Sequence, residues 1–133
     1  MKKRILMAIC LLVAFVACVH NGKQNSETDK IQYRRISAEE AKKMLDENSN
    51  TLLLDVRTRA EFLRGHIPGA ISLPSNELRS RAETELPDKD ALILVYCGSG
   101  KRSVNAALIL ISMGYTNVYD FGGIMAWKYG TTR

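Results

Sequence analysis

The sequence predicts an α/β domain with a mainly parallel central sheet of about five strands flanked by helices. Two observations indicate this fold class. Apolar segments suited to strands alternate along the chain with segments that carry helix-capping spacings. The two most apolar segments, 51–56 and 91–96, are nearly continuous in apolar residues, which is typical of strands buried on both faces of a parallel sheet.

The predicted elements begin with a short strand over 33–36. Ser37 then lies three residues before Glu40, which is the spacing of a capping box. We expect the helix that begins there to run to about Glu47, because a strand over 51–56 follows.

Thr58 and Glu61 repeat the capping-box spacing and predict a short helix. A short strand is predicted over 70–73, and Ser75 is predicted to open a helix that runs to about residue 85. Pro87 ends this helix, because proline has no backbone N–H and cannot continue it.

The strand over 91–96 is the most apolar of all, and Cys97 stands at its C-terminal end. A helix over 103–113, a strand over 118–121 and a terminal helical stretch with Trp127 complete the domain. Ligands of open parallel sheets bind beyond the carboxyl ends of the strands, where Cys97 is placed. Val104, Ala107, Leu108 and Ile111 form an apolar face on the 103–113 helix. Ile109, Leu110 and Met113 widen this face, so we expect the helix to be largely buried.

The N-terminus has the pattern of an export signal. A basic cluster over 2–4 precedes 15 residues without charge. A helix of that length spans about 22 Å, less than the hydrocarbon core of a bilayer. We therefore predict a signal peptide over 1–17, with a short buried or membrane-spanning helix as the alternative.

Residues 15–18 resemble the lipobox of bacterial lipoproteins, with Phe15 in place of the usual leucine. The resemblance implies a lipid on Cys18. The polar sequence that follows predicts a flexible tether over 18–30, and the remainder is predicted to fold as a domain over 31–133. The resemblance also implies an exported protein on the periplasmic side, anchored to a bacterial membrane. Ordinary cleavage near Ala17 or Cys18 is the alternative.

Removal of the signal changes what charge and cysteines indicate. The whole chain has a net charge of +5, but 16 basic and 14 acidic residues remain after residue 17. This balance and the lack of a run of like charges argue against a nucleic-acid partner. Cys10 leaves with the signal and a lipidated Cys18 cannot pair, so Cys97 has no partner for a disulfide, and no spacing supports a zinc site.

The segment 97–103 joins a buried strand to a helix and carries the chemistry. Gly98 and Gly100 allow a loop whose N–H groups converge on one point, and the helix N-terminus adds partial positive charge there. With two cationic side chains nearby, these features favour a thiolate and covalent catalysis by the cysteine. The nucleophile is Cys97, and the predicted substrate-binding residues are Gly98, Ser99, Gly100, Lys101, Arg102 and Ser103.

Three stretches of the chain resemble the rhodanese family: 54–70, the loop 97–102, and 122–127. The resemblance covers residues from about 33 to 130. It implies a parallel sheet flanked by helices and a loop cysteine that carries a persulfide during sulfur transfer. The spacing C-x4-R matches sulfurtransferases, whereas related phosphatases and arsenate reductases have a loop one residue longer.

The resemblance also favours structural roles for four residues near the site. Asp55 is expected to organise the active-site end of the sheet, Arg57 to pair with Glu61, and His66 to orient its turn through a hydrogen bond. A general-base role for His66 is the alternative. Trp127 and Phe62 are expected in the core.

The predicted function is transfer of a sulfane sulfur from thiosulfate or a similar anionic donor to a thiol or cyanide acceptor through a Cys97 persulfide. This chemistry needs no metal or organic cofactor, and we expect a monomer. One alternative is a persulfide carrier or binding module that serves a protein partner and turns over small molecules poorly. Another is a redox or detoxification role for Cys97.

Overall fold

Five parallel strands form one sheet in the order β1-β5-β4-β2-β3, as the sequence predicted for the fold class. The computed structural model describes residues 33–133. The signal peptide over 1–17, Cys18 and the tether over 18–30 lie outside this range. The strands are β1 (Arg34–Arg35), β2 (Leu52–Asp55), β3 (Ile71–Ser72), β4 (Ile93–Cys97) and β5 (Val118–Gly123). The helices are α1 (Ala38–Glu47), α2 (Arg59–Arg64), α3 (Leu78–Glu85), α4 (Lys101–Ser112) and the 3₁₀ turn η1 (Ile124–Ala126).

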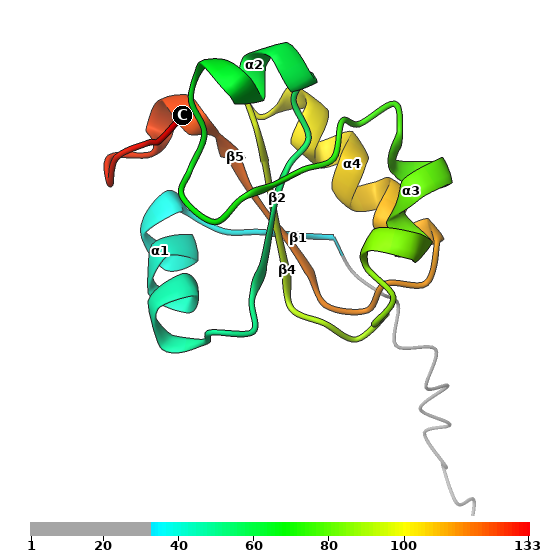
Figure 1. The fold of residues 1–133 in the computed structure, drawn as a ribbon. Coiled ribbons are helices and arrows are strands. Elements are labelled where there is room, and N and C mark those ends of the chain that lie inside the picture. The colour runs from blue at the N-terminus through cyan, green and yellow to red at the C-terminus, as the bar shows by residue number, and fades with distance from the viewer. Residues whose placement is uncertain (1–32) are drawn as a thin grey trace, which may run out of the picture.

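Helices cover both faces of the sheet (Figure 1). Helix α1 lies on one face, α3 and α4 lie on the other, and α2 lies at the end of the sheet toward which β2 runs. Successive residues of a strand point to opposite faces, so neighbours such as Leu53 and Leu54 belong to two separate core clusters. Both faces of β2 and β4 are therefore buried, as their apolar sequences indicated.

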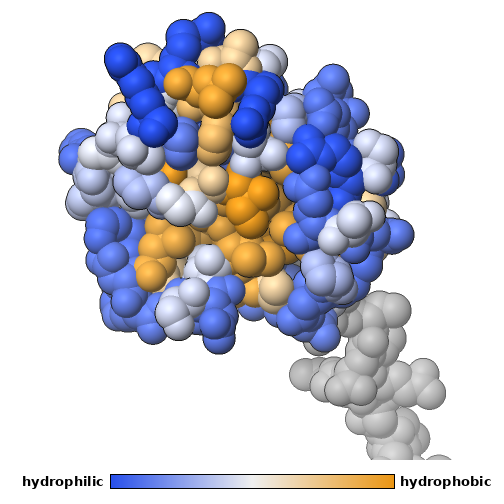
Figure 2. Space-filling model, viewed as in Figure 1, coloured by the Kyte–Doolittle hydropathy of each residue, from blue (hydrophilic) through white to orange (hydrophobic). Residues whose placement is uncertain are grey.

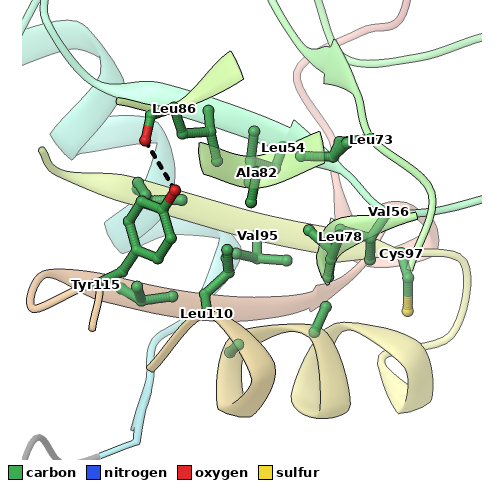
Figure 3. Close-up of a cluster of buried hydrophobic side chains, with 14 residues drawn as sticks. Leu54, Val56, Leu73, Leu78, Ala82, Leu86, Val95, Cys97, Leu110 and Tyr115 are labelled. Atoms are coloured by element: carbon green, nitrogen blue, oxygen red, sulfur yellow. Dashed lines mark hydrogen bonds between the residues drawn. The ribbon is translucent and has the colours of Figure 1, made fainter. Parts of the chain in front are cut away.

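The cluster on the α3 and α4 face contains the site cysteine at one end (Figure 3). At the other end, the Tyr115 hydroxyl donates a hydrogen bond of 2.8 Å to the Leu86 carbonyl. Val95 and Leu110 pack between these ends, so the strand that ends at Cys97 is fixed along its length by buried side chains.

The opposite face is less completely covered. Figure 2 shows apolar side chains gathered in a hollow between the polar surfaces over α1 and α3. A cavity of about 400 Å³ lies against α1, with Leu53, Ile67 and Trp127 in its lining. Trp127 is partly buried there and packs against the core cluster on this face, which confirms its predicted place in part. Phe62 is partly buried on α2 and belongs to neither core cluster, so its prediction as a core residue is wrong.

Both predicted capping boxes are confirmed. The Glu40 N–H donates to Ser37 Oγ over 3.0 Å, and the Ser37 N–H donates to Glu40 Oε2 over 2.7 Å. Thr58 and Glu61 make the same reciprocal pair at the start of α2. These contacts satisfy N–H groups that have no partner within the helix.

Two helices begin elsewhere than predicted. Helix α3 begins at Leu78, because the preceding three residues form a turn in which the Glu77 N–H bonds the Pro74 carbonyl over 2.8 Å. Helix α4 begins at Lys101, two residues earlier than predicted.

The buried face of α4 agrees only in part with the predicted one. Leu108 is 48% exposed, so its prediction as a buried residue is wrong. The residues that face the sheet are Ser103, Ala106, Ala107 and Leu110. Apolar residues cover more than one face of this helix, and the three small side chains let it approach the sheet closely.

Candidate active site

Cys97 is the last residue of β4, and the chain turns directly from it into α4. The cysteine is 0% exposed. Its Sγ accepts a hydrogen bond of 3.0 Å from the Gly100 N–H. Gly100 has a φ of +97°, which a residue with a Cβ rarely adopts, and this conformation turns its N–H back toward the sulfur.

The sulfur therefore lies at the N-terminus of a helix of 12 residues. The first N–H groups of a helix have no partners within it and together carry partial positive charge. Such a position stabilises negative charge on a nearby atom. One N–H of the predicted loop, that of Gly100, thus points at the sulfur, and the convergence of the other loop N–H groups stays a prediction.

The buried side chain of Ser103 contacts the backbone of this loop. Its hydroxyl lies within hydrogen-bond distance of two carbonyl oxygens, of Gly100 at 3.2 Å and of Gly122 at 3.3 Å. The residue is buried, so its side chain ties the loop to the end of β5. Its side chain thus has a structural role in addition to the ligand role predicted for the residue.

The end of β5 packs directly against the loop backbone. The pairing of β4 with β5 is irregular between Val95 and Cys97, and Cys97 pairs with Gly123. A Cβ at Gly123 would lie only 2.2 Å from the Gly98 carbonyl oxygen. The second glycine of the predicted C-terminal motif is therefore required for this contact.

Arg102 forms an ion pair with Glu61 of α2 beside the loop. Its Nη1 donates to Glu61 Oε2 over 2.7 Å, and its Nη2 donates to Oε1 over 2.8 Å. The hydrogen bonds from Arg102 hold the pKa of Glu61 well below its usual range. Both terminal nitrogens of Arg102, which the sequence predicted as a substrate-binding residue, thus donate to Glu61.

Arg57 pairs with Asp55, so the predicted Arg57–Glu61 pair is wrong. The Asp55 carboxylate accepts from Arg57 Nε at 3.0 Å and from Nη2 at 2.6 Å. Arg57 Nη2 also donates to the Gly65 carbonyl over 2.7 Å. The Asp55 carboxylate is buried at the end of β2, so its charge needs a partner close by, and Arg57 supplies it. Glu61 pairs with Arg102 instead.

His66 belongs to a separate set of contacts. Its Nδ1 lies 3.0 Å from the Phe62 carbonyl oxygen, and its ring stacks on the Phe62 ring with centroids 3.7 Å apart. Its backbone pairs with Thr132 near the C-terminus. Within residues 33–133 it has no hydrogen bond to the 97–103 loop, which agrees with the predicted orienting role.

Arg35 lies at the site, although the sequence analysis did not single it out. It is the last residue of β1, which runs parallel to β5. Its side chain therefore lies toward the carboxyl ends of the strands, where Cys97 also lies. Cβ atoms at Gly100 and Gly122 would lie 3.1 and 2.8 Å from Arg35 Nη2. Lys101, by contrast, is exposed on the first turn of α4.

Two further properties concern the part of the chain that the structure describes. No helix there is both long and apolar enough to cross a membrane. No three His, Cys, Asp or Glu side chains in this part gather in a group that could hold a metal ion.

Comparison with known proteins gives consistent matches. The family described as "Rhodanese-like domain" matches residues 37–129. The chain is 41% identical over 71 residues to the thiosulfate sulfurtransferase PspE of Escherichia coli (strain K12), covering 53% of this chain and 68% of the relative. It is 40% identical over 93 residues to a sulfurtransferase of Allochromatium vinosum, covering 69% of this chain and 85% of the relative. A solved structure of a rhodanese with anions from E. coli superposes with a TM-score of 0.59 and 35% identity, over 62% of this chain and 98% of the other.

Proposed function

Since the chain belongs to the rhodanese-like domain family, we propose that it is a sulfurtransferase that carries a sulfane sulfur on Cys97. Relatives named as sulfurtransferases support sulfur transfer at the level of the family. The observation that carries the proposal for this chain is the 3.0 Å hydrogen bond from the Gly100 N–H to Cys97 Sγ at the N-terminus of α4. This arrangement stabilises negative charge on the attacking sulfur and on a persulfide.

In the first step, the Cys97 thiolate attacks the outer sulfur of thiosulfate. A sulfur–sulfur bond forms at Sγ, the sulfur–sulfur bond of thiosulfate breaks, and sulfite leaves with the bonding electron pair. The terminal sulfur of the persulfide carries the remaining negative charge. The N–H groups at the start of α4 are the donors available to hold that charge.

In the second step, a thiophilic acceptor attacks the terminal sulfur and releases the Cys97 thiolate. With cyanide as the acceptor, the product is thiocyanate. Cys97 is the one cysteine in residues 33–133, so this domain supplies no second thiol to take the sulfur. The acceptor therefore comes from outside the domain, and the kinetics follow a ping-pong scheme.

Intact mass spectrometry tests this cycle. We expect the purified domain to gain the mass of one sulfur atom from thiosulfate and to lose it on addition of cyanide, with thiocyanate as the product. The Cys97→Ser variant should show neither change. A domain that gains no sulfur from thiosulfate or any other sulfane donor would contradict the proposal.

The same experiment separates an enzyme from a carrier. An enzyme repeats the cycle with small molecules, so thiocyanate accumulates beyond one equivalent of protein. A persulfide carrier would load once and then release its sulfur to small acceptors poorly. Multiple turnovers support the sulfurtransferase, and a single slow release would support the carrier.

We also propose, from the sequence of the N-terminal segment, that the exported domain is anchored to a bacterial membrane through a lipid on Cys18. The basic cluster, the uncharged run and the residues 15–18 support this. The Cys18→Ala variant is expected to move from the membrane fraction to the soluble fraction in the native host. Unchanged partitioning would contradict lipidation.

A further inference from the structure

Arg35 lies on the edge strand β1, and its side chain reaches the loop that begins at Cys97. It ends β1, and the neighbouring strand β5 separates it from β4. Its Nη2 lies so close to the backbone that Cβ atoms at Gly100 and Gly122 would approach it to 3.1 and 2.8 Å. The guanidinium therefore lies against the backbone at Gly100 of the loop and at Gly122 of β5.

One end of this guanidinium is anchored. Arg35 Nη1 donates to Asp120 Oδ2 over 3.2 Å. The buried Asp120 carboxylate also accepts from the Tyr33 hydroxyl at 2.6 Å and from the Gly122 N–H at 2.8 Å. Asp120 thus fixes the position of the Arg35 side chain relative to the end of β5.

The other end is available to a ligand. Within residues 33–133, Arg35 Nη2 makes no hydrogen bond, and the side chain is 50% exposed. Arg102, on the opposite side of the loop, donates through both of its terminal nitrogens to Glu61. Lys101 is exposed on the first turn of α4. Arg35 therefore differs from Arg102 in that it is held in place through one terminal nitrogen while the other makes no hydrogen bond.

The electrostatic relation to the sulfur points the same way. The pKa of Arg35 is raised, first by the neighbouring Tyr33 side chain, then by the charge of Asp120, and to a smaller degree by the charge of Cys97. A cation that senses the thiolate charge also attracts an anion that approaches the thiolate.

We propose that Arg35 binds the anionic end of the sulfur donor and so gives the site its preference for anionic donors such as thiosulfate. Nη2 donates to a sulfonate oxygen while the outer sulfur of the donor faces Cys97. This inference rests on the proposed sulfurtransferase function. It assigns donor recognition to β1 rather than to the two cationic residues of the loop.

The test compares two reagents that react with the same thiolate. Thiosulfate is a dianion and leaves a persulfide and sulfite. Methyl methanethiosulfonate is uncharged, and its reaction with the thiolate leaves a methyl disulfide and methanesulfinate. The second-order rate constants of both reactions at Cys97, followed by intact mass, separate donor recognition from thiolate reactivity.

We expect Arg35→Gln to lower the thiosulfate rate constant at least about 10-fold, because a hydrogen bond to a charged group is lost. The rate constant for methyl methanethiosulfonate should change by less than a factor of about two, since an uncharged reagent makes no such bond. Arg34→Gln is the matched control. Arg34 is the neighbouring arginine, and its Nη1 donates to the Tyr119 hydroxyl over 2.9 Å, so we expect both rate constants to remain unchanged.

Arg35→Lys keeps a positive charge for Asp120 and serves if Arg35→Gln does not fold. It lacks the second donor group and should also slow the thiosulfate reaction selectively. An equal fall in both rate constants, or an unchanged thiosulfate rate constant, would overturn the role of Arg35. A native domain that reacts with methyl methanethiosulfonate but gains no sulfur from thiosulfate would instead overturn the proposed function.

Discussion

Arg102 and Glu61 join α4 to α2 through two charged hydrogen bonds, beside the loop that begins at Cys97. Arg102 Nη2 lies so near Gly98 that a Cβ there would approach it to 3.1 Å. The ion pair therefore borders the backbone that turns around the sulfur. The last residue of the C-x4-R spacing holds the loop against a neighbouring helix.

The Glu61–Arg102 pair should make stability depend on pH in the acid range. Arg102 lowers the pKa of Glu61, so the folded protein keeps this carboxylate charged at pH values where the unfolded chain binds a proton. Its contribution is complete above about pH 4.3 and is lost as the pH falls further. Because both side chains are partly exposed, we expect Glu61→Gln to cost about 1 kcal/mol at pH 7.

Urea unfolding of the native chain and Glu61→Gln at pH 7 and at acid pH checks this expectation. Glutamine can still accept the capping hydrogen bond from Thr58, so the variant keeps the capping box while it removes the charge and one of the two acceptors of Arg102. The stability gap between the two proteins should narrow in acid. A gap that stays constant would contradict the assignment.

Gly123→Ala should disrupt the site by steric overlap alone. The new Cβ would lie 2.2 Å from the Gly98 carbonyl oxygen, while the φ of −108° at this position is open to any residue. We expect a loss of about 2 kcal/mol or more in the free energy of unfolding, together with slower sulfur loading.

Gly69→Ala is the comparison for this prediction. It has a φ of +84° but no atom within 4 Å of the added Cβ, so its cost is only the backbone strain of about 1–2 kcal/mol. Its sulfur loading should be unchanged. Chemical denaturation measures both variants, and a Gly123→Ala domain as stable and active as the native one would refute the packing argument.

Arg57→Met should be strongly destabilising because it leaves the buried Asp55 carboxylate without its charge partner. Loss of one member of a buried pair costs about 3–5 kcal/mol. The free energy of unfolding should recover in part when Asp55→Asn is added, since the unpaired charge is then removed. Arg59→Met on the exposed start of α2 is the control, and an equal effect there would argue against a specific pair.

His66→Gln should leave sulfur transfer nearly intact. The ring is engaged with Phe62 rather than with the loop. A general base contributes about 100-fold or more to a rate, so we expect a loss in kcat of less than about 10-fold. A hundredfold loss in steady-state thiocyanate formation, with normal folding by circular dichroism, would make His66 a participant in the chemistry.

The parts of the fold that could be predicted from the sequence depend on neighbours along the chain. Ser37 with Glu40 and Thr58 with Glu61 mark helix starts because both members of each capping box lie in one turn. The apolar run before Cys97 likewise indicated a buried strand end, and the cysteine is there.

The Glu61–Arg102 pair and the position of Arg35 depend instead on distant parts of the chain. Glu61 contacts Arg102 across 41 residues, and Arg35 contacts Asp120 across 85 residues. The order of strands in a parallel sheet is not written in any single segment, so β1 could not be placed next to β5 in advance. The Arg57–Asp55 pair spans only two residues, but the sequence does not show that Asp55 is buried at the end of β2, where its charge needs a partner.

The two outer strands of the sheet, β1 and β3, are each only two residues long. A long unpaired strand presents a row of backbone donors and acceptors to which another chain can add. Such short outer strands leave little room for a second molecule to extend the sheet. Many copies of this domain at high local concentration would thus resist edge-to-edge aggregation. The active site of each copy would then remain accessible from solvent.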